Sequence, residues 1–248
     1  MNAPMQPVTR IDEIAPDVFR ISTPVPPDVV PGGFTFNQYL IRDEQPLLFH
    51  TGPRKLFGFI RDAIGRVMPV SKLRYVAFSH FEADECGSLN HWLAVAPDAV
   101  PACGQIAAMV SIGDYADRPP QALAHGAQLV LGRRTVKWLD APHVPHGWDC
   151  GYMVETSTRT MFSGDLFTQF GAVHPALTSD DILEPSEAAR VAMDYYAHGT
   201  ETKTVIERLA AENPVTLACM HGPAWSGNGA ALLRELGSRL GATALRAA

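Results

Sequence analysis

Hydrophobic positions along most of the chain fall in short runs separated by proline, glycine and polar residues, a pattern typical of β-strands. These runs predict strands at residues 18–21, 36–41, 46–49, 73–78, 100–102, 127–131, 134–139, 152–155, 160–162 and 215–219. Apolar residues at helical spacing, such as Ile60, Ile64 and Val67, predict helices between and after the strands. The helices are expected at residues 57–67, 87–94, 104–109, 185–198, 202–212 and 229–239.

The order of these elements indicates the fold class. Strands come early and in pairs, and helices lie between and after them. This order favours an α+β fold, with two packed sheets flanked by helices, over a doubly wound parallel sheet. We find neither a repeat nor a linker, so we expect one domain over residues 1–248, with its core at about 18–240. The tail after Leu240 is expected to fray.

Composition narrows the range of partners. The chain is 46% hydrophobic and 19% charged, with a formal net charge of -6. Scattered acidic and basic residues argue against nucleic acid as a partner, because phosphate binding needs a basic face. We see no signal-peptide pattern and no run of roughly 20 apolar residues that could span a membrane. The four cysteines are far apart, which fits a reducing cytoplasm better than a disulfide framework.

A dense polar cluster follows the apolar run at residues 73–78. In an extended turn, His80, Glu82 and Asp84 point the same way and could converge on a metal ion. A solvated acidic loop that caps the next helix would explain Asp84 and Glu85 equally well. The cluster therefore needs partners elsewhere in the chain.

Such partners follow three later strands. His146 lies in a loop after residues 134–139, Asp165 comes directly after 160–162, and His221 follows 215–219. Loops at strand ends place ligands on a rigid support. One histidine at a strand end is usually structural, but several such positions together with the acidic cluster favour a shared metal site.

The order H-x-E-x-D, then a loop histidine, then strand-GD and strand-HG, resembles the metallo-β-lactamase superfamily. More narrowly, it is similar to the di-iron domain of flavodiiron proteins and to free-standing oxygen-binding di-iron proteins. Zinc hydrolases of the superfamily carry H-x-H-x-D-H, whereas the di-iron branch has glutamate at the position of Glu82. Three further matches are the N-x-Y-L-I strand at 36–41, the H-x-x-D loop at 146–149 and the H-G-x-x-W segment at 221–225.

The resemblance implies an αββα four-layer sandwich and a site for two iron ions. His80, Glu82 and His146 would hold one metal, Asp84 and His221 would hold the other, and Asp165 would bridge them. Imidazoles and carboxylates without a thiolate suit iron or manganese, and zinc is the further alternative.

The sequence departs from the family pattern at two positions. The family motif ends D-H, but this chain has Asp84–Glu85. Glu85 could bind the second metal as an anionic ligand, or it could point away and leave that site weak or empty. His50 stands where the superfamily usually has the aspartate of D-T-G. It could hydrogen-bond a ligand, or it could be a buried histidine with no role.

Three other residues are candidates for the surroundings of the site. His143 could replace His146 as a ligand, although the H-x-x-D spacing favours His146. Asp149 completes that motif, and His174 could line the mouth of the pocket.

Three functions remain open. The resemblance implies a protein that binds or reduces O2 or NO. Because no flavodoxin-like phosphate loop is visible, electrons would come from a separate donor protein, or the chain would bind O2 reversibly. A metal-dependent hydrolase of an ester, thioester or phosphoester is the second possibility. A non-catalytic oxygen or redox sensor is the third, and a homodimer would fit any of them.

Overall fold

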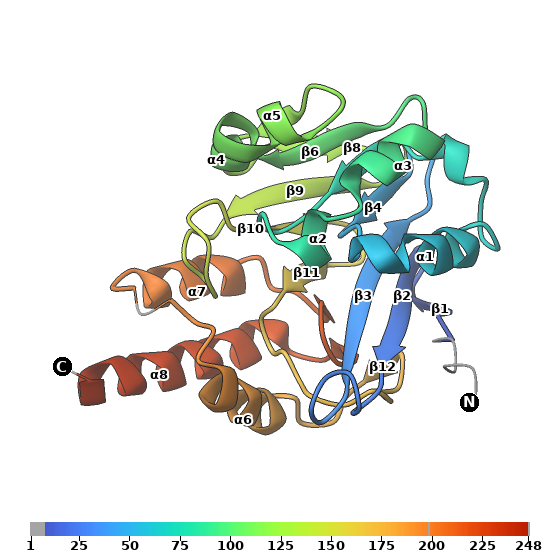
Figure 1. Cartoon of the computed structure of the whole chain (residues 1–248). Coiled ribbons are helices and arrows are strands. Elements are labelled where there is room, and N and C mark those ends of the chain that lie inside the picture. The colour runs from blue at the N-terminus through green and yellow to red at the C-terminus, as the bar shows by residue number, and fades with distance from the viewer. Residues whose placement is uncertain (1–7, 198, 248) are drawn as a thin grey trace.

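The computed structural model describes residues 8–197 and 199–247, with side chains placed as far as residue 241. Within these residues, two seven-stranded sheets pack face to face and helices cover both outer sides (Figure 1). No helix in the described part of the chain is long and apolar enough to cross a membrane.

The strands of each sheet are neighbours in a simple order. The first sheet runs β1 (Arg10–Ala15), β2 (Val18–Val25), β3 (Phe34–Ile41), β4 (Leu47–Phe49), β5 (Tyr75–Ala77), β6 (Val100–Gly104) and β7 (Gln121–Leu123). The second runs β12 (Leu177–Thr178), β14 (Ala224–Ser226), β13 (Thr216–Cys219), β11 (Thr160–Gly164), β10 (Gly151–Glu155), β9 (Thr135–Asp140) and β8 (Gln128–Val130).

The helices form the two outer layers. The first sheet is covered by α1 (Phe57–Ile64), α2 (Ala83–Cys86) and α3 (Leu89–Val95), and a helical segment after β6 comprises α4 (Gln105–Ala107), a π-helical turn (Ala108–Ile112) and α5 (Gly113–Tyr115). The second sheet is covered by α6 (Leu183–Met193), α7 (Thr202–Ala210) and α8 (Gly229–Ala247). Two short 3-10 turns, Arg54–Leu56 and Val70–Lys72, flank α1.

Alternating side chains along the strands divide the core into three interfaces. In β3, Leu40 packs against the helices of the first sheet, whereas Tyr39 and Ile41 face the second sheet. In β11, Met161 packs against the helices of the second sheet and Phe162 faces the first. Central strands such as β4 and β5 are buried on both faces and apolar, whereas edge strands such as β1 and β8 are partly exposed. The predicted four-layer αββα sandwich is confirmed.

Most predicted elements are present, but the sequence analysis missed four strands: β1, β7, β12 and β14. Of these, β1, β7 and β12 lie at sheet edges, and β7, β12 and β14 have only two or three residues. The helix predicted at 185–198 begins earlier, at Leu183, and ends at Met193 because Asp194 adopts a left-handed conformation with φ of 48°. Residue 198 lies outside the described part of the chain. The last helix continues to Ala247, beyond its predicted end at 239.

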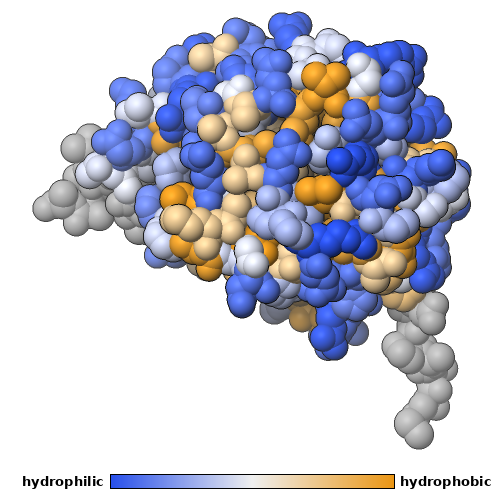
Figure 2. All heavy atoms as spheres, turned by 90° about the horizontal axis from the view of Figure 1, so that it is seen from above, coloured by the Kyte–Doolittle hydropathy of each residue, from blue (hydrophilic) through white to orange (hydrophobic). Residues whose placement is uncertain are grey.

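Polar residues cover most of the face of the molecule that Figure 2 shows. On the face shown in Figure 2, hydrophobic residues lie in small groups among hydrophilic ones. Large hydrophobic side chains exposed among the described residues include Met109 and Trp148, with exposed fractions of 73% and 58%. Phe81, which is 41% exposed, lies in the turn after β5.

Candidate metal centre

The predicted ligands come from four chain segments that meet at one end of the sandwich. His80 and Glu82 lie in the turn after β5, and Asp84 and Glu85 lie in the first turn of α2. His146 comes from the loop between β9 and β10, which contains the cis peptide bond Val144–Pro145. Asp165 follows β11 and His221 follows β13, so these two neighbouring parallel strands deliver both to the same edge.

The structure explains how the first segment converges, and corrects one expectation. Glu82 is extended, with φ of -135°, and serves as the N-terminal cap position of α2 without a capping hydrogen bond from its side chain. Asp84 is helical, so an extended turn does not account for its direction. The turn instead sends His80 and Glu82 to one side of the cluster and Asp84 to the other.

Two groups of side chains form around Asp165. On one side, His146 Nε2 lies 3.0 Å from Glu82 Oε1 and 3.5 Å from Asp165 Oδ2, and His80 Nε2 lies 3.6 Å from both oxygens. On the other side, His221 Nε2 lies 3.4 Å from both Asp84 Oδ2 and Asp165 Oδ1. We call these groups the first half-site (His80, Glu82, His146) and the second half-site (Asp84, His221). Asp165 therefore presents one oxygen to each half-site.

The far side of each imidazole ring is fixed by a hydrogen bond. His146 Nδ1 donates to the carbonyl oxygen of Tyr195 at 2.8 Å, and His221 Nδ1 donates to that of Thr35 at 2.7 Å. These bonds place the proton on Nδ1 and leave Nε2 free to bind a metal. Histidines that bind metals commonly have this arrangement.

His80 is connected to His50 by hydrogen bonds through the buried Ser79. Its Nδ1 lies 2.9 Å from Ser79 Oγ, which in turn lies 3.1 Å from His50 Nε2. His50 is completely buried, and burial lowers its pKa to about 3. Nε2 of a neutral His50 can accept a hydrogen bond from the Ser79 hydroxyl, which leaves the Ser79 oxygen free to accept one from His80 Nδ1–H. His50 therefore hydrogen-bonds Ser79 rather than a half-site residue, and its link to His80 runs through that serine.

The cluster is strongly polarised. Burial alone would lower the pKa of His221, but contacts with Asp165 and Asp84 raise it to about 9. Burial would lower the pKa of His80, but the nearby Cys150 and the surrounding carboxylates, among them Glu82, raise it above its usual range. The close approach of His146 and His80 lowers the pKa of Glu82 to about 2. The carboxylates thus attract positive charge to the positions where the imidazoles converge.

Several buried polar atoms in the cluster have no hydrogen-bond partner among the described residues. They include His80 Nε2, His146 Nε2, Asp165 Oδ1 and both side-chain oxygens of Glu85. Buried polar atoms without partners are unfavourable unless something else satisfies them. Because these atoms face one another across the two half-sites, the donor set fits a pair of metal ions.

The remaining candidates lie around this cluster rather than in it. His143 is exposed, and its described hydrogen bond is a backbone one to Gly147, so the geometry favours His146. The Asp149 carboxylate accepts the Phe81 backbone N–H at 3.0 Å and so fixes the turn between His80 and Glu82. His174 is half-buried and bonds to the carbonyl of Gly171, without a described contact to the half-sites.

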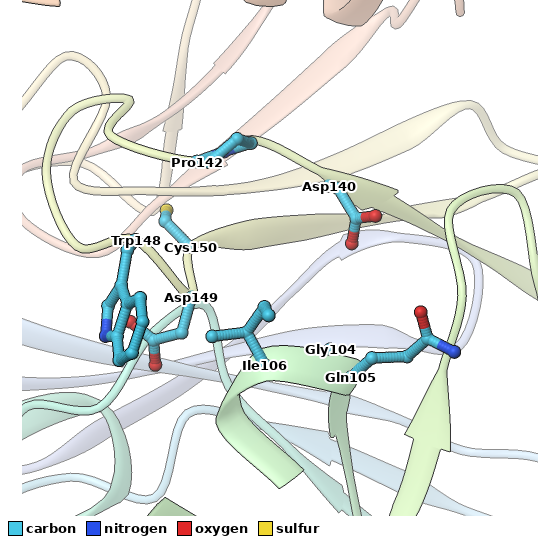
Figure 3. A pocket seen from close by; sticks show the side chains of 8 residues that line it. All are labelled: Gly104, Gln105, Ile106, Asp140, Pro142, Trp148, Asp149 and Cys150. Atoms are coloured by element: carbon cyan, nitrogen blue, oxygen red, sulfur yellow. The ribbon is translucent and has the colours of Figure 1, made fainter. Parts of the chain in front are cut away.

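A small cavity lies beside the cluster. It has a volume of about 140 Å³ and is lined by residues of the segment after β6 and of the loop before β10, including Ile106, Trp148 and Asp149 (Figure 3). None of the half-site residues lines it. The cluster opens to solvent instead at Glu82, whose side chain is 49% exposed, compared with 8% for Asp165.

Sequence analysis did not find the residues that support the second half-site. Asn37 Nδ2 donates to the carbonyls of Cys219 and Gly222, and Tyr39 Oη donates to that of Cys219. Arg20 donates to the Gly222 carbonyl at 2.8 Å. These bonds fix the loop that carries His221 to the first sheet. The N-x-Y-L-I motif was the available signal, because it contains Asn37 and Tyr39.

Two aromatic residues near the ligands had no signal in the sequence pattern. Tyr195 Oη donates to the backbone carbonyl of Asp165 at 3.0 Å, while the Tyr195 carbonyl accepts from His146. Tyr195 therefore hydrogen-bonds both to His146, in the loop before β10, and to Asp165, directly after β11. The Phe34 ring stacks on the His221 ring, with centroids 4.1 Å apart.

Residues 34–222 match a single protein family, described as ODP family beta lactamase. This chain belongs to that family. The resemblance stated for the sequence is thereby confirmed, and the matched residues of the ODP family include every member of both half-sites.

Curated relatives of this ODP family chain include flavodiiron enzymes. The chain is 30% identical over 171 residues to a rubredoxin-oxygen oxidoreductase from Megalodesulfovibrio gigas, covering 68% of this chain and 42% of the relative. It is 26% identical over 207 residues to an anaerobic nitric oxide reductase flavorubredoxin from Salmonella arizonae, covering 79% and 42%. The chain spans less than half the length of these relatives.

Solved structures show the same fold. The flavodiiron core of Flv1 from Synechocystis matches 95% of this chain and 61% of its own, with a TM-score of 0.82 at 20% identity. A fragment of a putative diflavin flavoprotein from Nostoc matches 96% and 97%, with a TM-score of 0.80 at 15% identity. At these identities, the structures establish the fold of this ODP family member and no more.

Proposed function

We propose that this chain holds two iron ions at the half-sites and binds or reduces O2 or NO there. The observation that carries the proposal is the position of Asp165, whose two oxygens face different half-sites. Curated relatives of the family are named for reactions with oxygen and nitric oxide. The donor set and the relatives therefore support the same chemistry.

Each residue has a defined task in this proposal. His80, Glu82 and His146 would hold one ion, Asp84 and His221 would hold the other, and Asp165 would contribute one oxygen to each. When bound, a pair of ferrous ions can share the two-electron reduction of O2 or couple two NO molecules. The described residues contribute ligand charge and orientation, because the Nδ1 hydrogen bonds of His146 and His221 prevent the rings from rotating.

The surroundings support a site that admits small ligands. The half-exposed Glu82 lies at the opening, whereas Asp165 and His221 are almost completely buried. The half-buried rings of Phe34 and Phe36 pack against the His221 ring. These apolar rings limit water around His221, while the exposed part of Glu82 leaves room for a small molecule such as O2 or NO.

The choice of iron rests on the donors. Three imidazoles and several carboxylates suit iron or manganese, while the absence of a thiolate ligand at the half-sites makes zinc less favourable. For reduction, electrons would come from a separate donor protein in the cytoplasm. Reversible O2 binding would need no such donor.

Metal analysis tests the proposal directly. We would express the protein with iron and zinc both available, measure its metals, and record absorbance spectra before and after anaerobic protein meets air. About two irons per chain with a spectral change would support the proposal. Zinc alone, together with no O2 or NO reactivity after ferrous reconstitution, would contradict it and favour a hydrolase, which ester and phosphodiester substrates would then reveal.

A further inference from the structure

Glu85 has an environment that the proposed ligand set leaves unexplained. Its side chain is completely buried in α2, and its two carboxylate oxygens have no hydrogen-bond partner among the described residues. The main chain holds this residue firmly, since its carbonyl accepts the Thr51 N–H at 2.7 Å. A buried carboxylate without partners is unfavourable unless a cation or hydrogen-bond donor reaches it.

The position of Glu85 relates it to both half-sites. One of its oxygens lies within 4.8 Å of ligand atoms of His80 and Glu82, which belong to the first half-site. An oxygen of Glu85 also lies within 4.8 Å of ligand atoms of Asp84 and His221, which form the second half-site. A ligand of the second metal alone, which was one of the two alternatives for Glu85, would not need to approach His80 and Glu82.

We propose that Glu85 is a second bridging carboxylate, binding one metal ion with each oxygen and acting beside Asp165. This inference rests on the proposed two-metal function. With Glu82, Asp84, Glu85 and Asp165 ionised, four negative charges would offset the charge of two divalent ions. The missing histidine of the family motif is then replaced by a residue that serves both ions.

A bridging role makes a specific prediction about affinity. Loss of a ligand to one ion weakens that binding step, whereas loss of a bridge weakens both. Removing even a hydrogen-bond partner of a ligand typically weakens metal binding about 10–100-fold, so loss of the Glu85 charge should weaken each step about tenfold or more.

The test is a titration of metal-free protein with Mn²⁺ alone, which avoids the oxidation of ferrous iron. Wild type should bind two ions per chain. Glu85→Gln keeps the side chain's shape, and it should weaken both binding steps. Glu44→Gln is the matched control, because Glu44 is exposed and far from the half-sites in the sequence, and it should leave both steps unchanged.

The outcomes separate this inference from the proposed function. Weakening confined to one step, or no weakening, would overturn the bridge. If wild type binds two ions but the iron-loaded protein does not react with O2 or NO, the proposed function fails and the bridge stands. If wild type binds fewer than two ions, both fail.

A crystal structure of wild type loaded with Mn²⁺ gives a direct reading that does not depend on the folding of a variant. It should show the two Glu85 oxygens on different ions. Both oxygens on one ion, or neither on a metal, would refute the bridge.

Discussion

Ser79 offers a sharp test of how the first half-site is organised. Ser79→Ala removes the hydroxyl that lies 2.9 Å from His80 Nδ1 and 3.1 Å from His50 Nε2. If His80 binds a metal through Nε2, its proton must sit on Nδ1, and the substitution leaves that buried donor without its acceptor. The His80 ring then loses both its orientation and part of its basicity.

The expected magnitude follows from the geometry. Removal of such a hydrogen-bond partner weakens metal binding about 10–100-fold, which corresponds to about 1.4–2.7 kcal/mol. The loss should appear only in the binding step of the first half-site, because the second is held by Asp84 and His221, and His221 is oriented by Thr35 instead. Metal-free protein should lose about 1–3 kcal/mol of stability as well, from the unpaired buried groups.

The assay is a Mn²⁺ titration in competition with a chelator, with urea unfolding of the metal-free protein alongside it. Ser186→Ala is the matched control, since this serine is also buried and its hydroxyl donates to the Leu183 carbonyl at 2.8 Å within α6. Equal weakening of both metal steps, or unchanged affinity, would refute the assigned role of Ser79.

A double-mutant cycle shows whether His50 acts through Ser79. His50 has φ of 65°, and asparagine tolerates that conformation, so His50→Asn is the suitable substitution. Alone, it should weaken binding at the first half-site. Combined with Ser79→Ala, it should add little, because residues in one hydrogen-bonded chain are not independent. Additive losses would indicate that His50 acts by another route.

Three further predictions concern the support of the site and the stability of the fold. Gly164→Ala should destabilise the protein by about 1–3 kcal/mol and displace Asp165, because Gly164 has φ of +51° and the new methyl would lie 2.9 Å from the Tyr152 ring. Chemical denaturation measures the loss of stability, and metal titration measures the effect on Asp165. Tyr195→Phe should reduce stability by about 1 kcal/mol by removing the bond to the Asp165 carbonyl, and unchanged urea unfolding would contradict this. Burial alone would raise the pKa of Glu155, but hydrogen bonds from the following turn lower it. The ionised carboxylate therefore stabilises the fold fully above the unfolded pKa of about 4.3, and this stabilisation is lost as the pH falls through the lower folded pKa. Glu155→Gln should therefore cost about 2 kcal/mol at pH 7 and progressively less in acid, as urea unfolding at several pH values would show.

The sequence predicted the layers of the fold well because both faces of each sheet are buried. In strands such as β4 and β5, every residue is buried and apolar or aromatic, and such runs are easy to detect. The missed strand β12 has two residues and pairs only at an edge of the described sheet, so its existence depends on neighbours from distant parts of the chain. Local pattern carries little information about such strands.

The grouping of the ligands was also predictable, but through the family pattern rather than through local geometry. An extended turn would have pointed His80, Glu82 and Asp84 in one direction, whereas α2 begins within the segment and separates Asp84 from the other two. The hydrogen bond from Tyr195 to Asp165 depends on the path of the chain after α6, and no local sequence motif predicts that path.

The two departures from the family pattern are related through charge. At His50, the superfamily's aspartate is replaced by a buried histidine that burial keeps neutral, so a negative charge behind His80 is lost. At Glu85, a histidine is replaced by a carboxylate that lies between the half-sites, so a negative charge is gained. If Glu85 is ionised when metal is bound, as the proposed bridge requires, the carboxylate charge lost behind His80 is regained at a position facing both half-sites. A charge behind His80 acts on the first half-site mainly, whereas a charge between the half-sites attracts both ions. The two substitutions then amount to one rearrangement of negative charge around the site rather than two separate defects.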